Sequence, residues 1–211
     1  MLTVNIMSYK YGHLVAHCVD SLLSQTKVPD VIRVYDDGIG DCKHIKDLYP
    51  EVKLIERPEN LGTTKNFQDA LERTTTEYVL FIGADNWLHQ DAIRLLSEKK
   101  ADIICYDIAL TGTEKDKFAQ RLNTELVDGY LIWEFQYEVT PEQMKSRNRI
   151  HGSSMYRTEV AKKYGYIQKG QDKNPQEDWG LFQKMIEGGA TYDLVPKPLL
   201  FYRRHRENFI K

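Results

Sequence analysis

The sequence lacks several features that would assign it to a specialised class of protein. It contains only three cysteines, Cys18, Cys42 and Cys105. Their odd number and wide spacing match neither a disulfide framework nor a zinc site, so we expect buried, reduced thiols. No apolar run approaches the roughly 20 residues that a membrane-spanning helix needs. The run Leu2–Met7 is too short for the apolar part of a signal peptide, so we expect a cytoplasmic protein.

An excess of charge of either sign is also absent. The formal net charge of -2 argues against a general polyanion binder, although it allows a local basic patch. Internal repeats, low-complexity tracts and interdomain linkers are missing too. The 211 residues, 41% of them hydrophobic and 28% charged, therefore predict one ordinary globular domain.

What the first half does contain is a regular alternation of short apolar runs with helical patterns. Strands are predicted at residues 2–7, 31–35, 52–56, 78–82 and 102–106. Helices are predicted between them, at residues 12–25, 42–49, 60–74 and 91–99, the third with Asn60 as its N-cap. Strands that alternate with helices indicate right-handed βαβ units, and hence an α/β fold with a mostly parallel sheet flanked by helices.

The second half is less regular. Residues 126–137 are rich in aromatics and are compatible with strand or helix. Thr140-Pro141-Glu142-Gln143 predicts a capped helix start, and Gly165 a helix stop. A further helix is expected from residue 177 to Gly188-Gly189, followed by strand-like pieces at 192–195 and 199–202.

Polar residues follow four successive predicted strands. In open α/β sheets, ligands bind beyond the carboxyl ends of the strands. The four polar segments are Ser8-Tyr9-Lys10, Asp36-Asp37-Gly38, Arg57-Pro58-Glu59-Asn60 and Gly83-Ala84-Asp85-Asn86. Each has an ordinary explanation as a turn or a helix cap when taken alone. Their joint placement predicts one shared binding crevice.

Four motifs in this order resemble family-2 glycosyltransferases of the GT-A fold. They lie in NIMSYKYGHLVAHCVDSLLSQTKVPDVIRVYDDGIGD, PENLGTTKNFQDALERTTTEYVLFIGADNW and EDWGLFQKMIEGGATYDLVPKPLLFYRRHREN. The resemblance covers about residues 3–107 and 150–208. It implies a single Rossmann-like domain over residues 1–211, with a nucleotide-sugar-binding half at about 1–107. Residues of about 108–211 would then form the acceptor-binding and catalytic half.

The resemblance also implies which residues hold the donor. Asp36 and Asp37 would accept hydrogen bonds from the nucleobase and ribose. Asn60, Lys65 and Asn66 match positions near the base and phosphates, with Lys65 where arginine is common. The remaining expected donor-site residues are Ser8, Tyr9, Ala84 and Asp85.

A divalent cation, Mn²⁺ or Mg²⁺, is implied at Asp85, which matches the metal-binding aspartate of the family's D-x-D motif. The family motif often begins with another acid, but this chain has Gly83 there and Asn86 where a further aspartate is frequent. His205 matches a histidine that completes the metal site in some relatives. Taken alone, such a histidine is more often an ordinary surface residue.

The acidic pair Glu177-Asp178 matches the position of the family's general base, with Asp178 as the matching residue. A bare acidic pair at a helix start would simply complement the helix dipole. The implied reaction is a metal-assisted, inverting displacement that moves a sugar from a nucleotide-diphosphate donor to an acceptor hydroxyl.

Several alternatives stay open at the level of sequence. UDP-sugars are the commonest donors in the family, and the expected acceptor is a glycan or lipid-linked intermediate, with a modified DNA base less favoured. Trp179 could stack on a sugar or pack in the core, and the aromatics of 130–137 could be core or acceptor loop. A nucleotidyltransferase and a nucleotide-sugar-binding protein without activity are the competing functions. The oligomeric state is left open.

Overall fold

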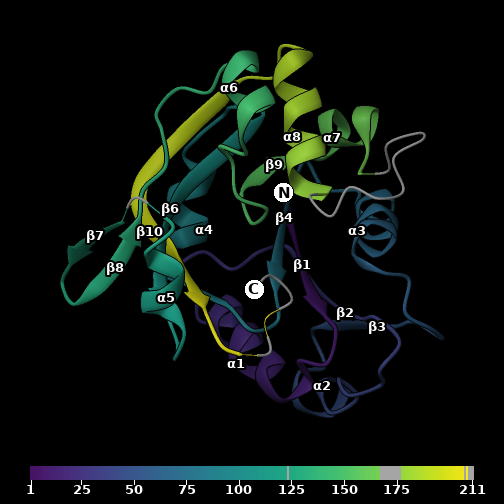
Figure 1. Ribbon diagram of the computed structural model, residues 1–211. Coiled ribbons are helices and arrows are strands. Elements are labelled where there is room, and N and C mark those ends of the chain that lie inside the picture. Colours follow the sequence, from purple (N-terminus) through teal and green to yellow (C-terminus); the bar gives the residue numbers. More distant parts are fainter. Residues whose placement is uncertain (123, 167–176, 207, 209–211) are drawn as a thin grey trace.

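The computed structural model describes residues 1–122, 124–166, 177–206 and 208, with the backbone alone at residue 177 (Figure 1). Its strands are β1 (Leu2–Ser8), β2 (Val31–Asp36), β3 (Lys53–Glu56), β4 (Tyr78–Gly83), β5 (Trp87–Leu88), β6 (Ile103–Thr111), β7 (Thr124–Val127), β8 (Tyr130–Trp133), β9 (Met155–Arg157) and β10 (Tyr192–Arg203). Its helices are α1 (Gly12–Leu23), α2 (Ile45–Leu48), α3 (Thr63–Glu72), α4 (Ala92–Ser97), α5 (Lys115–Ala119), α6 (Pro141–Ser146), α7 (Thr158–Tyr164) and α8 (Glu177–Glu187).

One mixed sheet runs through both predicted halves of the chain, in the order β3-β2-β1-β4-β9-β6-β10-β5. The strands β3, β2, β1 and β4 are parallel neighbours, and β6 and β10 form a second parallel pair. The short strand β9 joins these two groups because it pairs antiparallel with both β4 and β6. The predicted α/β fold is therefore confirmed, and the carboxyl ends of β1, β2 and β4 open at one edge of the sheet.

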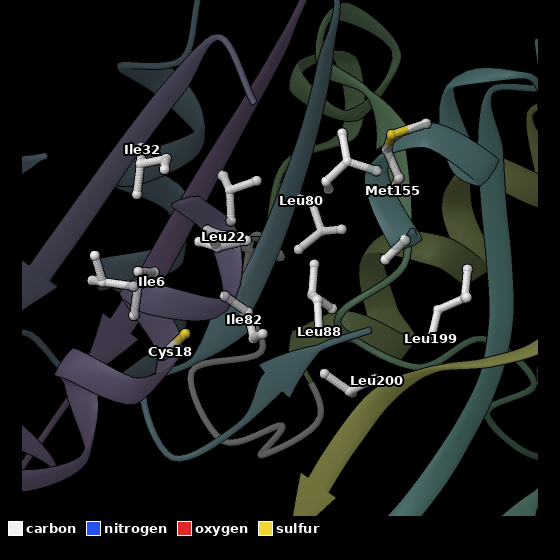
Figure 2. Close-up of a cluster of buried hydrophobic side chains, with 14 of the residues drawn as sticks. Ile6, Cys18, Leu22, Ile32, Leu80, Ile82, Leu88, Met155, Leu199 and Leu200 are labelled. Atoms are coloured by element: carbon white, nitrogen blue, oxygen red, sulfur yellow. The ribbon is translucent and has the colours of Figure 1, made fainter. Parts of the chain in front are cut away.

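The sheet carries a hydrophobic core on each face. Because strand side chains alternate between faces, Leu80 and Ile82 of β4 pack on one face while Val79 and Phe81 pack on the other. The first face is covered by α1, α2, α4 and α5, and Figure 2 shows how Cys18 and Leu22 of α1 meet its strand residues. The second face is covered by α3, α6, α7 and α8. All three cysteines are buried and form no disulfide, as predicted.

Helix boundaries follow the capping signals closely, with one exception. Thr140 accepts from the backbone N–H of Gln143 while the Gln143 side chain accepts from the N–H of Thr140, which is the predicted capping box. Gly165 ends α7 at a φ of 70°. The prediction that Asn60 caps the next helix is wrong. Its Oδ1 accepts from Gly62 N in a local turn, and α3 begins only at Thr63.

The last strand differs most from its prediction. The two pieces expected at 192–195 and 199–202 form one strand, β10, paired with β6 along its length. Pro196 and Pro198 interrupt the sequence pattern, and the structure accommodates them with register shifts between Val195 and Leu200. The strand β5 and the helix α5 were not predicted. Within the described ranges, no helix is long and apolar enough to cross a membrane.

Candidate active site

A cavity of about 1360 Å³ opens where the parallel strands end. It exceeds the roughly 300–1,000 Å³ of a typical small-molecule pocket, so it has room for two substrates at once. Of the predicted site residues, Ser8, Tyr9, Asp37, Asn60, Asn66, Asp85 and Asp178 line it. The polar segments after the four strands therefore do meet at one crevice. Residues near the C-terminal end of the chain also line it.

Asp37 and the loop after β3 form one wall of the cavity. The Asp37 Oδ1 atom accepts from the backbone N–H of Leu61 at 2.9 Å, which fastens the turn after β2 to this loop. Gly38 allows the contact, because a Cβ atom there would lie 2.3 Å from the backbone carbon of Glu59. Burial raises the pKa of Asp37 above its ordinary value. Asp37 is therefore a fixed, partly desolvated carboxylate on the cavity wall.

Asp36 has a different environment from its neighbour. It is 1% exposed, and it is absent from the described residues that line the cavity. Its Oδ1 accepts from the backbone N–H groups of Ile39 and Gly40, both at 3.0 Å, and its Oδ2 accepts from Cys42 N at 3.1 Å. Both carboxylate oxygens thus hold the loop that follows β2. Direct contact of Asp36 with a nucleotide stays a prediction from the resemblance.

Asp36, Asp41 and Cys42 place three potential ligand atoms within 4.8 Å of one another. Two observations argue against a metal site here. Burial raises the pKa of the Cys42 thiol to about 12, so a cation would have to displace the proton of a buried thiol in order to bind there. The Asp41 Oδ2 atom already accepts from Gly12 N at 3.0 Å. We interpret the cluster as the anchor that joins the loop after β2 to the start of α1.

Asp85 lies at the centre of a second cluster, where the chain returns after β10. Its Oδ2 lies 3.3 Å from His205 Nε2 and accepts from Asn208 Nδ2 at 2.9 Å. Burial raises the pKa of Asp85. Asn86 supports the contact between Asp85 and His205. Its Oδ1 accepts from the backbone N–H of Arg203 at 2.9 Å and so holds the end of β10 beside the carboxyl end of β4. The structure therefore brings Asp85 and His205 together, as the resemblance implied.

The donor set around Asp85 fits a divalent cation that shares its coordination with a diphosphate. It offers one carboxylate and one imidazole nitrogen, and the diphosphate oxygens would supply further ligands. Asn208 turns Nδ2 toward Asp85, while its Oδ1 accepts from the backbone N–H of His205. Gly83 explains why a second acid is missing. A Cβ atom there would lie 2.7 Å from Asp85 Oδ1 and 2.9 Å from Asn86 Nδ2. Any side chain at position 83 would displace the Asp85 carboxylate from its present place.

Asp178 lines the cavity from the first turn of α8. Its Oδ1 accepts from Trp179 N at 2.7 Å, and its Oδ2 accepts from Asn148 Nδ2 at 3.3 Å. Gly152 packs against the same carboxylate, since a Cβ atom there would lie 3.0 Å from Asp178 Oδ2. Burial raises the pKa of Asp178, while the two hydrogen bonds oppose the shift. A carboxylate with a raised pKa on a cavity wall is the property expected of a general base.

The other predicted residues divide between the cavity and its surroundings. Lys65 is exposed on α3, and Ala84 is buried behind Asp85; neither is among the lining residues described. The side chain of Glu177 lies outside the described residues. Trp179 lines the cavity and donates through Nε1 to the carbonyl of Met144 on α6.

The aromatic stretch divides in the same way. Trp133 and Phe135 line the cavity, whereas Tyr130 and Tyr137 are exposed. Sequence reasoning did not single out Asn148 or Asn208, because asparagine carries no charge pattern that would distinguish it. Gly152 lies in the segment of residues 151–157, whose resemblance to a strand on the acceptor side of the family and whose small residues predict close backbone approach.

The model of glycosyltransferase family 2 matches residues 3–165 of this chain. The chain belongs to glycosyltransferase family 2. It is similar to glycosyltransferase GlyA of Streptococcus pneumoniae serotype 4, with 29% identity over 103 residues that make up 46% of this chain and 15% of that protein.

Solved structures share the fold over nearly the whole chain. Residues 1–349 of TarS from S. aureus, in complex with UDP-GlcNAc, match with a TM-score of 0.68 and 18% identity, over 98% of this chain and 59% of that one. The mannosyltransferase PcManGT from Pyrobaculum calidifontis, in complex with GDP-Man and Mn²⁺, matches with a TM-score of 0.67 and 15% identity, over 99% of this chain and 58% of that one. The chain spans only 15% to 24% of the length of the curated relatives that it matches.

Proposed function

We propose that this protein is an inverting glycosyltransferase that moves a sugar from a nucleotide-diphosphate donor, preferably a UDP-sugar, to an acceptor hydroxyl. The observation that carries the proposal is the single cavity lined by Asp37, Asp85 and Asp178. A nucleotide-reading carboxylate, a cation-binding carboxylate and a general base then face one space. Membership of glycosyltransferase family 2 supports the transfer of a sugar, and the matched residues 3–165 include Asp37 and Asp85.

The donor would lie along the carboxyl ends of β2, β1 and β4. Asp37 would accept hydrogen bonds from the nucleoside, and Asn60 would donate or accept them. Asn66 of α3 lines the same cavity. Asp85 and His205 would hold a divalent cation, Mn²⁺ or Mg²⁺, which would neutralise charge on the leaving diphosphate when bound. The relatives support this arrangement, since TarS binds UDP-GlcNAc and PcManGT binds GDP-Man with Mn²⁺.

The acceptor would enter between the donor and α8. Asp178 would take the proton of the attacking hydroxyl while that oxygen forms its bond to the anomeric carbon and the bond to the diphosphate breaks. One displacement of this kind inverts the anomeric centre. Asn148 and the backbone N–H of Trp179 would keep the Asp178 carboxylate aimed at the hydroxyl. A glycan or a lipid-linked intermediate is the proposed acceptor, and a modified DNA base is a less favoured one.

The test compares the parent protein with Asp178→Asn and Asp85→Asn, using a panel of UDP- and GDP-sugars with and without Mn²⁺. We expect slow Mn²⁺-stimulated donor hydrolysis by the parent, and a UDP-sugar that turns over fastest. Asp178→Asn should abolish transfer to any acceptor found, and leave the donor dissociation constant within about twofold, because the change removes a base and retains the side-chain volume.

Two outcomes would contradict the proposal. If the parent showed no metal-stimulated turnover with any donor while still binding UDP, the chain would be a nucleotide-sugar-binding protein. If Asp178→Asn retained transfer, the general base would be another residue. A folded state that matches the parent, checked by circular dichroism, is the control for both variants.

A further inference from the structure

A second pocket, of about 170 Å³, lies beside the candidate active site. It is formed by α5, by Glu114 and Arg121 on either side of that helix, and by the segment that follows β10. Its described lining residues are Glu114, Lys117, Phe118, Arg121, Arg204, His205, Arg206 and Asn208. Three of these residues, Phe118, Arg204 and Asn208, also line the large cavity. The two spaces are therefore neighbours that share a wall.

This pocket concentrates positive charge on a protein whose net charge is -2. Four basic side chains line it, and Glu114 is the one acidic side chain among its described lining residues. The ion pair between Arg206 and Glu114 spans 3.5 Å, and the Arg206 side chain is 91% exposed. The four basic side chains and Glu114 leave a formal charge of +3 (four positive charges less one) among the described lining residues, so an anion that entered would meet a positive surface.

The central cation, Arg204, is held in place by its surroundings. It is 5% exposed, its guanidinium carbon lies 4.1 Å from the ring centre of Phe118, and its Nη1 donates to the hydroxyl of Tyr202 at 3.2 Å. Its backbone is fixed as well. The N–H of Arg204 donates to the carbonyl of Thr111 and its own carbonyl accepts from Glu114 N. The start of α5 is thereby bound to the end of β10, and the pocket is part of the fold.

We propose that this pocket binds a phosphate ester of the acceptor; the inference rests on the proposed glycosyl transfer. Arginine and lysine N–H groups that converge on a small space are the usual partners of phosphate. The pocket is well below the size of a typical small-molecule site, so it suits one substituent of a larger molecule. The acceptor would then present its hydroxyl in the large cavity while a phosphate a short distance along it sits between α5 and Arg204.

The position of the pocket favours the acceptor over the donor as the source of this phosphate. In the proposed donor position, Asp37, Asn60 and Asn66 would hold the nucleoside beside β2 and α3, and Asp85 would lie next to the donor diphosphate. The helix α5 lies on the opposite side of the molecule from α3 (Figure 1). The pocket shares His205 and Asn208 with the surroundings of Asp85, whereas Lys117, Arg121 and Arg206 lie outside the residues that line the large cavity. These three side chains would therefore be available to a second anionic group when a donor diphosphate is bound at Asp85.

The experiment measures binding to the whole chain after it has been saturated with UDP and Mn²⁺. The probes are a synthetic glycerol phosphate oligomer, a short-prenyl diphosphate-linked N-acetylglucosamine, a neutral oligosaccharide of similar length and a short DNA duplex. The variant is Lys117→Ala with Arg121→Ala. Its matched control is Lys27→Ala with Lys53→Ala, which removes two exposed lysines outside both described pockets.

We expect a phosphate-bearing probe to bind more weakly as salt rises, and the neutral oligosaccharide to bind at least tenfold more weakly than that probe. Loss of two charged hydrogen-bond donors should weaken the phosphate-bearing probe by about tenfold or more in the variant and not in the control. Preference for the oligomer identifies a phosphodiester chain as the source, and preference for the prenyl conjugate identifies a lipid diphosphate; either result supports the proposal.

Three results would overturn it. The first is a variant that binds the probes as tightly as the parent does. The second is a DNA duplex that binds more tightly than either phosphate ester, and the third is a UDP affinity that falls by the same factor in the variant. The last result would assign the pocket to the donor. A separate titration of UDP into the parent distinguishes failure of this proposal from failure of the proposed function. If UDP does not bind, the proposed glycosyl transfer is contradicted. The probe titrations can then be repeated without UDP, and they still report on the pocket.

Discussion

At the scale of single residues, the two adjacent aspartates at the end of β2 have different surroundings. Asp37 lines the cavity, whereas both oxygens of Asp36 accept hydrogen bonds from its own loop. The sequence alone gave no reason to distinguish them, since adjacent acids at a strand end look alike. Hydrogen bonds from backbone N–H groups to a buried carboxylate depend on how the loop folds, and the order of residues does not reveal this.

This difference predicts opposite effects of two matched substitutions. Asp36→Asn turns an amide N–H₂ group toward at least one backbone N–H and should lower the free energy of unfolding by about 1–3 kcal/mol. Asp37→Asn keeps an oxygen for Leu61 N, so its stability should stay within about 0.5 kcal/mol of the parent. Its affinity for a nucleotide should fall about tenfold as a charged acceptor is lost. Urea unfolding and UDP titration measure the two effects. If Asp36→Asn lost as much UDP affinity as Asp37→Asn and kept the stability of the parent, Asp36 would be a nucleotide contact.

The raised pKa of Asp178 predicts how transfer depends on pH. A general base must be ionised, so the rate should rise as pH increases through that pKa, at a pH above the ordinary range of aspartate. Asn148 donates to the ionised carboxylate and so lowers its pKa. Asn148→Ala should therefore move the acidic limb of the kcat profile to higher pH and leave the donor KM nearly unchanged. The control is Lys145→Ala, an exposed change on α6. An acidic limb at the same pH in both variants would show that Asn148 does not position the base.

At the scale of elements, long periodic segments were predictable and short ones were not. The strands β1, β2, β3 and β4 each follow a clear apolar run, and their observed bounds lie within a residue or two of the predicted ones. The strand β5 has two residues and α5 has five, so neither contains enough of a period to be recognised. Both nevertheless matter for the site. The strand β5 pairs with β10 near its end, and α5 forms the wall that separates the two cavities.

The closing strand shows why tertiary pairing overrides local pattern. Two prolines in β10 remove backbone donors, which made the segment look like two strands. The pairing with β6 continues past them, because the register shifts there. Because the pairing continues, Arg203 lies beside the carboxyl end of β4, where its backbone N–H donates to Asn86. The meeting of His205 with Asp85 is thus a property of the sheet, and the resemblance implied it without giving the physical cause.

At the scale of the whole molecule, the donor and cation should bind cooperatively. In the cation site that we propose, Asp85 would supply the one carboxylate, so Mn²⁺ alone should bind weakly and the diphosphate of UDP should complete its coordination. A ligand at one hundred times its dissociation constant stabilises a folded protein by about 2.7 kcal/mol. For a protein of this size that corresponds to a rise in Tm of roughly 5–10 °C.

Differential scanning fluorimetry with UDP, Mn²⁺ and both together checks this linkage. We expect the rise in Tm with both ligands to exceed the sum of the separate rises. Asp85→Asn should keep the shift caused by UDP alone and lose the extra shift caused by Mn²⁺, because in the proposed arrangement Asp37 and Asn60 would bind the nucleoside without the cation. If Mn²⁺ alone raised Tm as much as the pair did, the cation would have a complete protein site elsewhere. The cluster of Asp36, Asp41 and Cys42 would then be the next to test, with Asp41→Asn as the variant that removes its more accessible carboxylate.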